Sequence, residues 1–254
     1  SALPKDPETS PAQVGWIDAI AVNPAFQHRG LGSTLMAWGE QWLRDEGCNK
    51  ARLGGSLHPF TPGYPNELDD IAFFTKRGYV ERAGGGEVWD VARDLEGYPQ
   101  SQPPAGAEIR PMQPGEADAL LHFLQREFPN RWRFEYQEFL RESGRISDWI
   151  ILLTERGVDG FASLTFEDSI QPINRYYPYR LPRPWGQLGP IGVSAAVRGK
   201  GFGRALLDGA LGHLRDRGVR GAVIDWTSLV GFYSRFGFQP YRRYTIMSKT
   251  LRQI

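Results

Sequence analysis

The chain has 254 residues, enough for one large domain or two of ordinary size, and its 41% hydrophobic and 23% charged residues are normal for a globular protein. The formal net charge is +1 and no long block of like charge occurs, so neither a nucleic-acid footprint nor a basic membrane-binding face is expected. Cys48 is the single cysteine, which excludes an internal disulfide, and no apolar run approaches the ~20 residues of a membrane span. We therefore expect a cytoplasmic protein.

The first part of the chain predicts a few strands and helices after a flexible terminus of residues 1–13. Alternating β-forming residues predict the first strand, and a glycine turn then opens a helix with apolar residues on one face. The expected elements are strands at 14–22, 52–54 and 88–95 and helices at 31–45 and 69–76. Residues 97–107 hold three prolines and two glycines without apolar periodicity, which predicts a linker.

The second part, residues 108–254, predicts a longer series. Two helices come early, and a hairpin across Arg156-Gly157 follows them. The expected elements are strands at 109–112, 149–154, 160–166, 187–193, 222–226 and 243–251 and helices at 116–128, 134–142, 202–217 and 229–236. Strands and helices mixed in this way predict an α/β fold.

Two segments of the chain match each other without a gap. Residues 20–32 align with residues 191–203, so that Val22 pairs with Val193 and Gly30 with Gly201. Further on, Arg77-Gly78-Tyr79 has its counterpart in Phe236-Gly237-Phe238. We interpret residues 14–96 as a first copy that begins only at the fourth strand of the unit, and residues 108–254 as a complete second copy. Either the gene product lost the front half of the first copy, or the chain starts downstream of it.

Each copy places a glycine-containing turn between a strand and an amphipathic helix. Glycine lets the backbone approach an anion closely, and the first amides of a helix lack internal partners, so a diphosphate can bind there. In the second copy these amides belong to Arg198, Gly199, Lys200, Gly201, Phe202, Gly203 and Arg204. In the first copy they belong to Gln27, His28, Arg29, Gly30, Leu31, Gly32 and Ser33. Dinucleotide binding is disfavoured because no third glycine follows Gly203 at the required spacing.

The patterns Gln27-x-x-Gly30-x-Gly32 and Arg198-x-x-Gly201-x-Gly203 resemble motif A of the GNAT superfamily of N-acetyltransferases. The segment 232–238, with Tyr233 four residues before Gly237-Phe238, resembles motif B of the same superfamily. Together these likenesses cover nearly all of the second copy and the rear half of the first.

The resemblance implies a mixed, splayed sheet with two copies in tandem, and acetyl-coenzyme A in the notch between two parallel strands. It implies that the pantetheine arm pairs with the backbone of Ile191 and Val193, with Val22 as the first copy's equivalent, and that the Val193 amide holds the thioester oxygen. A primary amine of a small molecule would attack the thioester directly, and Tyr233 would protonate the leaving thiolate.

The copies differ at the residues that the chemistry needs. Phe74 stands where the second copy has Tyr233, and Asp18 stands where the second copy has Gly189, so neither copy carries both a phenol and an acidic group there. Asp225, at the end of an apolar strand, is a candidate base or acceptor anchor, since burial raises the pKa of a carboxyl group. An ion pair or a helix cap is its alternative role.

The loop at 170–185 is expected to line the acceptor side of the second copy, with an amino sugar as one acceptor that would fit. Its substrate candidates are Tyr176, Tyr177 and Arg180, whose aromatic and cationic groups suit a sugar or an anionic acceptor. Packing of this loop between the copies is the alternative. A metal is not expected, and a homodimer is left open. Two other functions remain open: a non-catalytic acyl-coenzyme A-binding protein, and an acetyltransferase acting on proteins or peptides.

Overall fold

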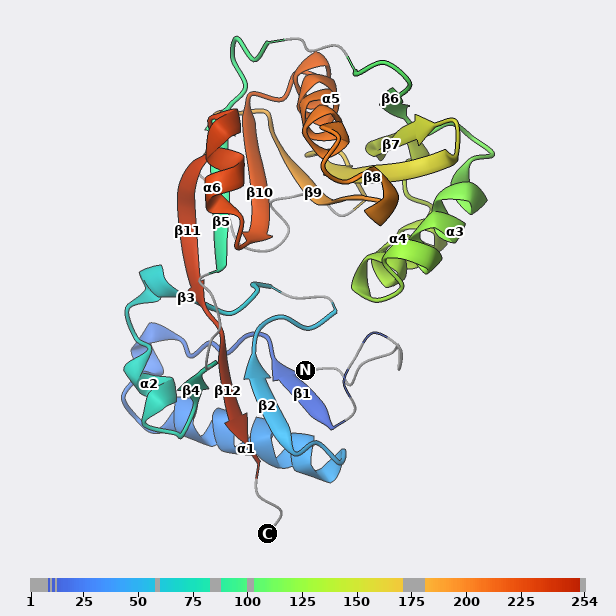
Figure 1. Cartoon of the computed structure of the whole chain (residues 1–254). Coiled ribbons are helices and arrows are strands. Elements are labelled where there is room, and N and C mark those ends of the chain that lie inside the picture. Colours follow the sequence, from blue (N-terminus) through green and yellow to red (C-terminus); the bar gives the residue numbers. More distant parts are fainter. Residues whose placement is uncertain are drawn as a thin grey trace. The chain divides into compact units, whose positions relative to one another are not determined.

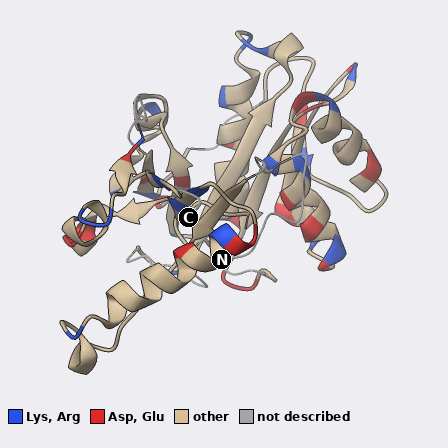
Figure 2. Ribbon diagram, turned by 90° about the horizontal axis from the view of Figure 1, so that it is seen from below, with Lys and Arg blue, Asp and Glu red and all other residues tan. Residues whose placement is uncertain are grey.

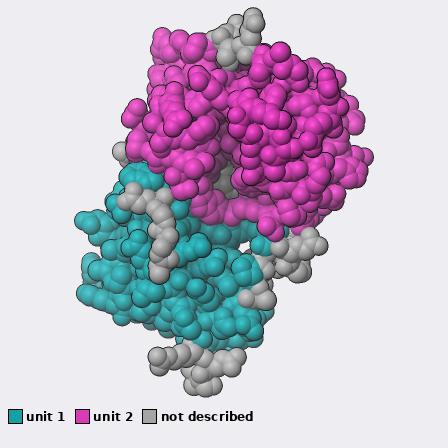
Figure 3. All heavy atoms as spheres, viewed as in Figure 1, with its two compact units in different colours: residues 1–89, 242–254 teal, residues 90–241 magenta. Residues whose placement is uncertain are grey.

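The computed structural model describes residues 9, 11, 13–57, 60–82, 88–99, 103–170 and 181–251. The chain divides into two compact units, unit 1 with residues 1–89 and 242–254 and unit 2 with residues 90–241 (Figure 3). Each unit combines a sheet with flanking helices, as the predicted α/β class requires (Figure 1). Within the described residues, none of the helices has the length and apolar character needed to cross a membrane.

Unit 1 contains a four-stranded sheet with the order β1-β2-β12-β4. Strand β1 runs parallel to β2, whereas β12 runs antiparallel to both β2 and β4. The elements of unit 1 are β1 (Val14–Ile17), α1 (Leu31–Asp45), β2 (Lys50–Leu53), β3 (Tyr64–Pro65), α2 (Ala72–Thr75), β4 (Val80–Glu81) and β12 (Met247–Thr250).

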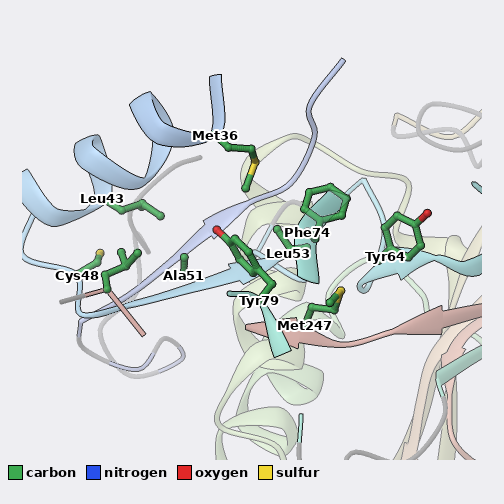
Figure 4. Close-up of a cluster of buried hydrophobic side chains, with 10 residues drawn as sticks. Met36, Leu43, Cys48, Ala51, Leu53, Tyr64, Phe74, Tyr79 and Met247 are labelled. Carbon is green, nitrogen blue, oxygen red and sulfur yellow. The ribbon is translucent and has the colours of Figure 1, made fainter. Parts of the chain in front are cut away.

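The core of unit 1 joins residues from both ends of the chain. Figure 4 shows Met36 of α1, Leu53 of β2, Phe74 of α2 and Met247 of β12 directed into one cluster. Cys48 is buried in the same cluster, and burial raises the pKa of its thiol, so it packs in the core and forms the reactive thiolate less readily than an exposed cysteine.

Unit 2 is built on a longer sheet in which the strands follow the order β11-β5-β10-β9-β8-β7-β6. Strand β10 is parallel to β9, while β6, β7, β8 and β9 pair antiparallel in succession. Its elements are β5 (Val88–Asp94), β6 (Glu108–Pro111), α3 (Ala117–Glu127), α4 (Arg131–Arg141), β7 (Trp149–Thr154), β8 (Gly157–Thr165), β9 (Trp185–Val193), α5 (Phe202–Asp216), β10 (Gly221–Thr227), α6 (Val230–Tyr233) and β11 (Gln239–Thr245). The first two residues of β5 and the last four of β11 belong to unit 1, where Tyr244 and Thr245 pair with β3.

The units do not follow the expected boundaries at 96 and 108. Residues 90–94 of β5, which close the first copy in sequence, lie in the sheet of unit 2 beside β10. The last strand of the chain, β12, lies in unit 1 beside β2. The strand expected at 243–251 is therefore broken between Thr245 and Met247, because its two halves pair in different sheets. Similarly, the strand expected at 14–22 ends at Ile17, the last residue that pairs with β2.

Helices α1 and α5 occupy matching positions in the repeat but have different surroundings. Leu206 of α5 is completely buried, and a Cβ placed on Gly160 of β8 would lie 3.2 Å from it. Leu35, its counterpart on α1, is 45% exposed, and Trp38, one turn further, is 70% exposed. In the part of unit 1 that the structure describes, no strand covers this face of α1. Lysine and arginine are interspersed with aspartate and glutamate over the described ribbon (Figure 2).

Candidate functional site

The two parallel strands at the centre of unit 2 pair only at their beginnings. Gly221 to Val223 of β10 pair with Trp185 to Gln187 of β9, and the remaining residues of both strands have no mutual pairing. The strands diverge toward their carboxyl ends, as Figure 1 shows, and the surface of unit 2 is hollowed in this region (Figure 3). A notch therefore opens between the second half of β9 and the end of β10.

The chain segment that follows β9 is anchored by buried polar contacts. Ser194 is completely buried, its side chain accepts a hydrogen bond from the Ala196 amide, and its own amide donates to the carbonyl of Asp159. Glu127, the last residue of α3, accepts hydrogen bonds from the Ala195 amide at 3.0 Å and from the Ser194 hydroxyl at 3.3 Å. The bond from the Ala195 amide is the main reason that the pKa of Glu127 is lowered, so the carboxylate stays charged and holds the loop.

Helix α5 starts from this loop with two left-handed residues, Gly199 with φ 76° and Gly201 with φ 83°. Such angles favour glycine, and they turn the chain so that the amides of the first helical turn point out of the helix. Among the described residues, a Cβ on Gly203 would meet only the methyl groups of Val193, at 3.9 and 4.0 Å, so in that part of the chain the space over the helix start is open. With 15 residues behind it, α5 adds its dipole to these amides, and the arrangement fits a diphosphate.

Asp225 lies in the notch between the diverging strands. Its side chain faces Gln187 and Gly189 of β9, and a Cβ on Gly189 would lie 3.4 Å from the carboxyl oxygen of Asp225. Burial raises the pKa of Asp225, while a hydrogen bond from Gln187 and the charge of Arg131 act in the opposite direction. The carboxyl group can therefore exchange a proton at a higher pH than an exposed aspartate.

Tyr233 ends helix α6 and is only 6% exposed. Burial, and secondly the negative charge of Asp225, raise the pKa of Tyr233 to about 12. Its ring packs edge-on against Phe238 at 6.1 Å between centroids. The phenol thus keeps its proton at every physiological pH and is available as a donor.

Helix α4 contributes a cation to the same side of unit 2. The guanidinium of Arg131 lies 4.0 Å from the ring of Trp226, the residue after Asp225. This stack places one flat aromatic group and one positive charge beside the carboxyl group of Asp225.

Unit 1 repeats the backbone of the loop closely. Gly30 has the same φ of 83° as Gly201, and His28 is left-handed like Gly199, with φ 59°. Asn23 takes the place of Ser194 and accepts a hydrogen bond from the Ala25 amide at 3.0 Å, while the side-chain amide of Gln27 donates to the carbonyl of Val22 at 3.0 Å.

The space over the start of α1 is nevertheless filled. A Cβ on Gly32 would lie 3.2 Å from the ring of Phe73, whereas a Cβ on the equivalent Gly203 would come no closer than 3.9 Å to any side chain that the structure describes. Arg77 stacks on the Phe73 ring at 3.6 Å and donates to the Ser33 hydroxyl and the Phe73 carbonyl, which holds the ring in place. Phe74, which replaces Tyr233, is a core residue beside Tyr64, at 5.6 Å between ring centroids.

Asp225 and Tyr233, the two catalytic candidates of the second copy, lie near enough for the charge of Asp225 to raise the pKa of Tyr233; their catalytic roles stay a prediction. Asp18 of the first copy instead accepts a hydrogen bond from the Ser56 amide at 3.3 Å. The predicted substrate residues Tyr176, Tyr177 and Arg180 lie outside the described residues. Sequence reasoning missed Glu127, Gln187 and Arg131, since no motif or spacing connects them to the loop.

A splayed parallel strand pair, a glycine-started helix and a buried tyrosine together match the acetyltransferase fold that the two motifs predicted. A family model described as "Acetyltransferase (GNAT) family" matches residues 2–79 and 117–238. The chain belongs to the GNAT acetyltransferase family.

Three curated relatives are mycothiol acetyltransferases. The chain is 28% identical to that of Cellulomonas flavigena over 86% of its length and 63% of the relative's, and 27% identical to that of Saccharomonospora viridis over 87% and 70%. It is 27% identical to that of Actinosynnema mirum over 61% and 52%. The chain thus spans between about half and 70% of the length of these relatives.

Two solved structures resemble the chain over most of its length. One is the GCN5-related glucosamine N-acetyltransferase region of a fungal multi-domain GH3 β-N-acetylglucosaminidase, with a TM-score of 0.77, 27% identity, and coverage of 92% of this chain and 29% of that one. The other is a tandem GNAT protein from the clavulanic acid biosynthesis pathway, with a TM-score of 0.66, 16% identity, and coverage of 96% and 77%. At 16% identity, the similarity to the tandem GNAT protein shows a shared fold and says nothing about activity.

Proposed function

We propose that the chain is an acetyl-coenzyme A-dependent N-acetyltransferase whose active site lies in the second copy and whose acceptor is the primary amine of a small molecule. The observation that carries the proposal is the notch between β9 and β10, which opens beside the glycine-started helix α5 and contains Asp225, with the buried Tyr233 near enough for the charge of Asp225 to raise its pKa. The first copy supports the second: Phe74 has no proton to give, and Phe73 fills the space over its loop.

The open cradle at Gly203 and the amides of residues 199–204 fit the diphosphate of acetyl-coenzyme A, which supplies the thioester. The amide of Arg198, which the sequence placed among them, instead donates to the carbonyl of Ala195. The backbone of Ile191 and Val193, on the edge of β9 left free by β10, lies where an extended pantetheine arm could pair as an added strand. The Val193 amide would hold the thioester oxygen as its negative charge develops.

Asp225 and Tyr233 divide the proton transfers between them. The carboxylate of Asp225, with its raised pKa, accepts a proton from the acceptor ammonium group, directly or through water. The phenol of Tyr233 donates its proton to the leaving thiolate; in the buried site the proton affinity of the thiolate is also raised by desolvation.

Several observations support a small acceptor. The guanidinium of Arg131 stacks on the ring of Trp226 and is paired with Glu135, and it adds a positive charge beside Asp225 that suits a hydroxyl-rich or anionic acceptor. Acidic and basic residues are interspersed over the described ribbon (Figure 2), an arrangement that offers a basic peptide little attraction. The glucosamine N-acetyltransferase region and the mycothiol acetyltransferases, both named for small acceptors, point to an amino sugar or a derivative of one.

The test is thiol release from acetyl-coenzyme A with a panel of amino sugars and other amines. Tyr233→Phe should lower kcat on the order of a hundredfold or more while coenzyme A still protects the protein against heat. Tyr136→Phe is the matched control, since Tyr136 is a buried tyrosine that donates to the Ala117 carbonyl in the core. Unchanged turnover of Tyr233→Phe would refute the general-acid role. Heat protection without release by any amine would favour a non-catalytic acyl-coenzyme A-binding protein.

A further inference from the structure

A strained backbone position lies at the centre of the proposed site. Trp226 adopts φ 55°, in the left-handed region, although it is neither glycine nor asparagine. Bulky residues are rarely found there, and such a conformation persists only when neighbouring groups hold it. The bend falls directly after Asp225, near the end of β10.

The group that holds this bend is Asp90 of β5. Its carboxyl oxygen accepts a hydrogen bond from the main-chain amide of Trp226 at 3.1 Å, and its side chain is completely buried. Burial of a carboxyl group costs free energy unless hydrogen bonds satisfy its oxygens, so the bond from the Trp226 amide stabilises Asp90 at this buried position. In sequence Asp90 belongs to the first copy, yet β5 lies beside β10 in the sheet of unit 2.

The amide that Asp90 holds belongs to the peptide unit between Asp225 and Trp226. Because a peptide unit is planar, holding it in one orientation fixes two backbone torsion angles, ψ of Asp225 and φ of Trp226. Asp225 is thereby kept against Gln187, and Trp226 is kept under the guanidinium of Arg131. A single hydrogen bond thus sets the directions of two side chains in the notch.

We propose that Asp90 is a positioning residue through which the closing strand of the first copy completes the acceptor side of the second copy's active site. The inference rests on the proposed function for its catalytic consequence. It makes the first copy a necessary part of the site, although that copy lacks the tyrosine.

The kinetic test compares Asp90→Ala, which removes the acceptor, with Asp90→Asn, which retains an oxygen acceptor of the same shape. Asp90→Ala should lower kcat/KM for the amine between tenfold and a hundredfold, mostly through KM, because small displacements of positioned groups have effects of about this size. Its thermal protection by coenzyme A should remain, and Asp90→Asn should stay within about threefold of the wild type. Asp148→Ala is the matched control: Asp148 is 2% exposed and bonded to Arg145 and Ser169, so the variant should lose stability and keep the wild-type KM.

Wild-type kinetics of a folded Asp90→Ala variant would overturn the proposal, and so would an Asp90→Asn variant as impaired as Asp90→Ala. A second measurement does not need activity. Glycine adopts positive φ without strain, so Asp90→Ala should shift the urea midpoint less in a Trp226→Gly background than in the wild type. Equal shifts in the two backgrounds would contradict the link between Asp90 and the bend. If no amine is acetylated, this cycle still decides on Asp90 while the proposed function fails.

Discussion

Leu206 and Leu35 occupy the same position in the two copies, and truncation of each to alanine should have very different effects on stability. Leu206 is completely buried against β8, so Leu206→Ala leaves a cavity and should lower the free energy of unfolding by about 2 to 5 kcal/mol. Leu35 is 45% exposed, so Leu35→Ala loses only part of the burial of its methyl and methylene groups, about 1 kcal/mol or less.

The assay is urea unfolding followed by far-ultraviolet circular dichroism, with thermal melts as a second measure. At about 2 to 4 °C per kcal/mol, Leu206→Ala should lower Tm by roughly 4 to 20 °C and Leu35→Ala by a few degrees at most. If the two units unfold in separate transitions, Leu206→Ala should move only that of unit 2. Equal losses in the two variants would refute the reasoning, because they would mean that the exposed face of α1 is covered in solution.

Two predictions concern pH. Burial, followed by the charge of Arg217, lowers the pKa of His213 in the folded protein. Below pH ~6.5 the unfolded chain therefore binds a proton at His213 that the folded protein does not bind. The contribution of His213 to the free energy of unfolding should be complete above that pH and decrease below it. Urea unfolding at pH 7.5 and pH 5.5 should show this loss in the wild type and a smaller one in His213→Phe, and the same loss in both would contradict it. Because burial raises the pKa of Tyr233 to about 12, its protonated form persists through alkaline pH, and kcat should stay level up to about pH 10. An alkaline decline centred near pH 8 that disappears in Tyr233→Phe would show that the phenol titrates much lower.

Local pattern predicted most elements and the loop of each copy. The helix expected at 202–217 is α5, because its buried residues recur with helical spacing, and the strand expected at 149–154 has those bounds as β7. The paired glycine turns were recognisable because left-handed residues such as Gly201 leave a signature in sequence.

Long-range pairing left no such signature. Residues 90–94 of β5 and all of β12 each close one copy in sequence and lie in the other unit, and the alternation of residues in a strand does not specify its neighbour. Asp90 and Arg131 reach the site only through this pairing and through the packing of α4, so spacing along the chain could not reveal them. The closure of the first loop by Phe73 likewise depends on Arg77, whose contact with Ser33 is a tertiary one.

The central claim is that the loop of the second copy binds coenzyme A, and thermal protection of two matched variants tests it most directly. Ligand at a hundred times its Kd stabilises by about 2.7 kcal/mol, so Tm of the wild type should rise by roughly 5 to 11 °C. Gly203→Val adds a side chain whose Cβ meets only ordinary contacts at 3.9 Å, so the fold should persist and the protection should disappear. Gly32→Val, in the first copy, should start from a lower Tm because its Cβ lies 3.2 Å from the ring of Phe73, but coenzyme A should raise that Tm as much as it does in the wild type. Full protection of Gly203→Val, or none in the wild type, would contradict the account.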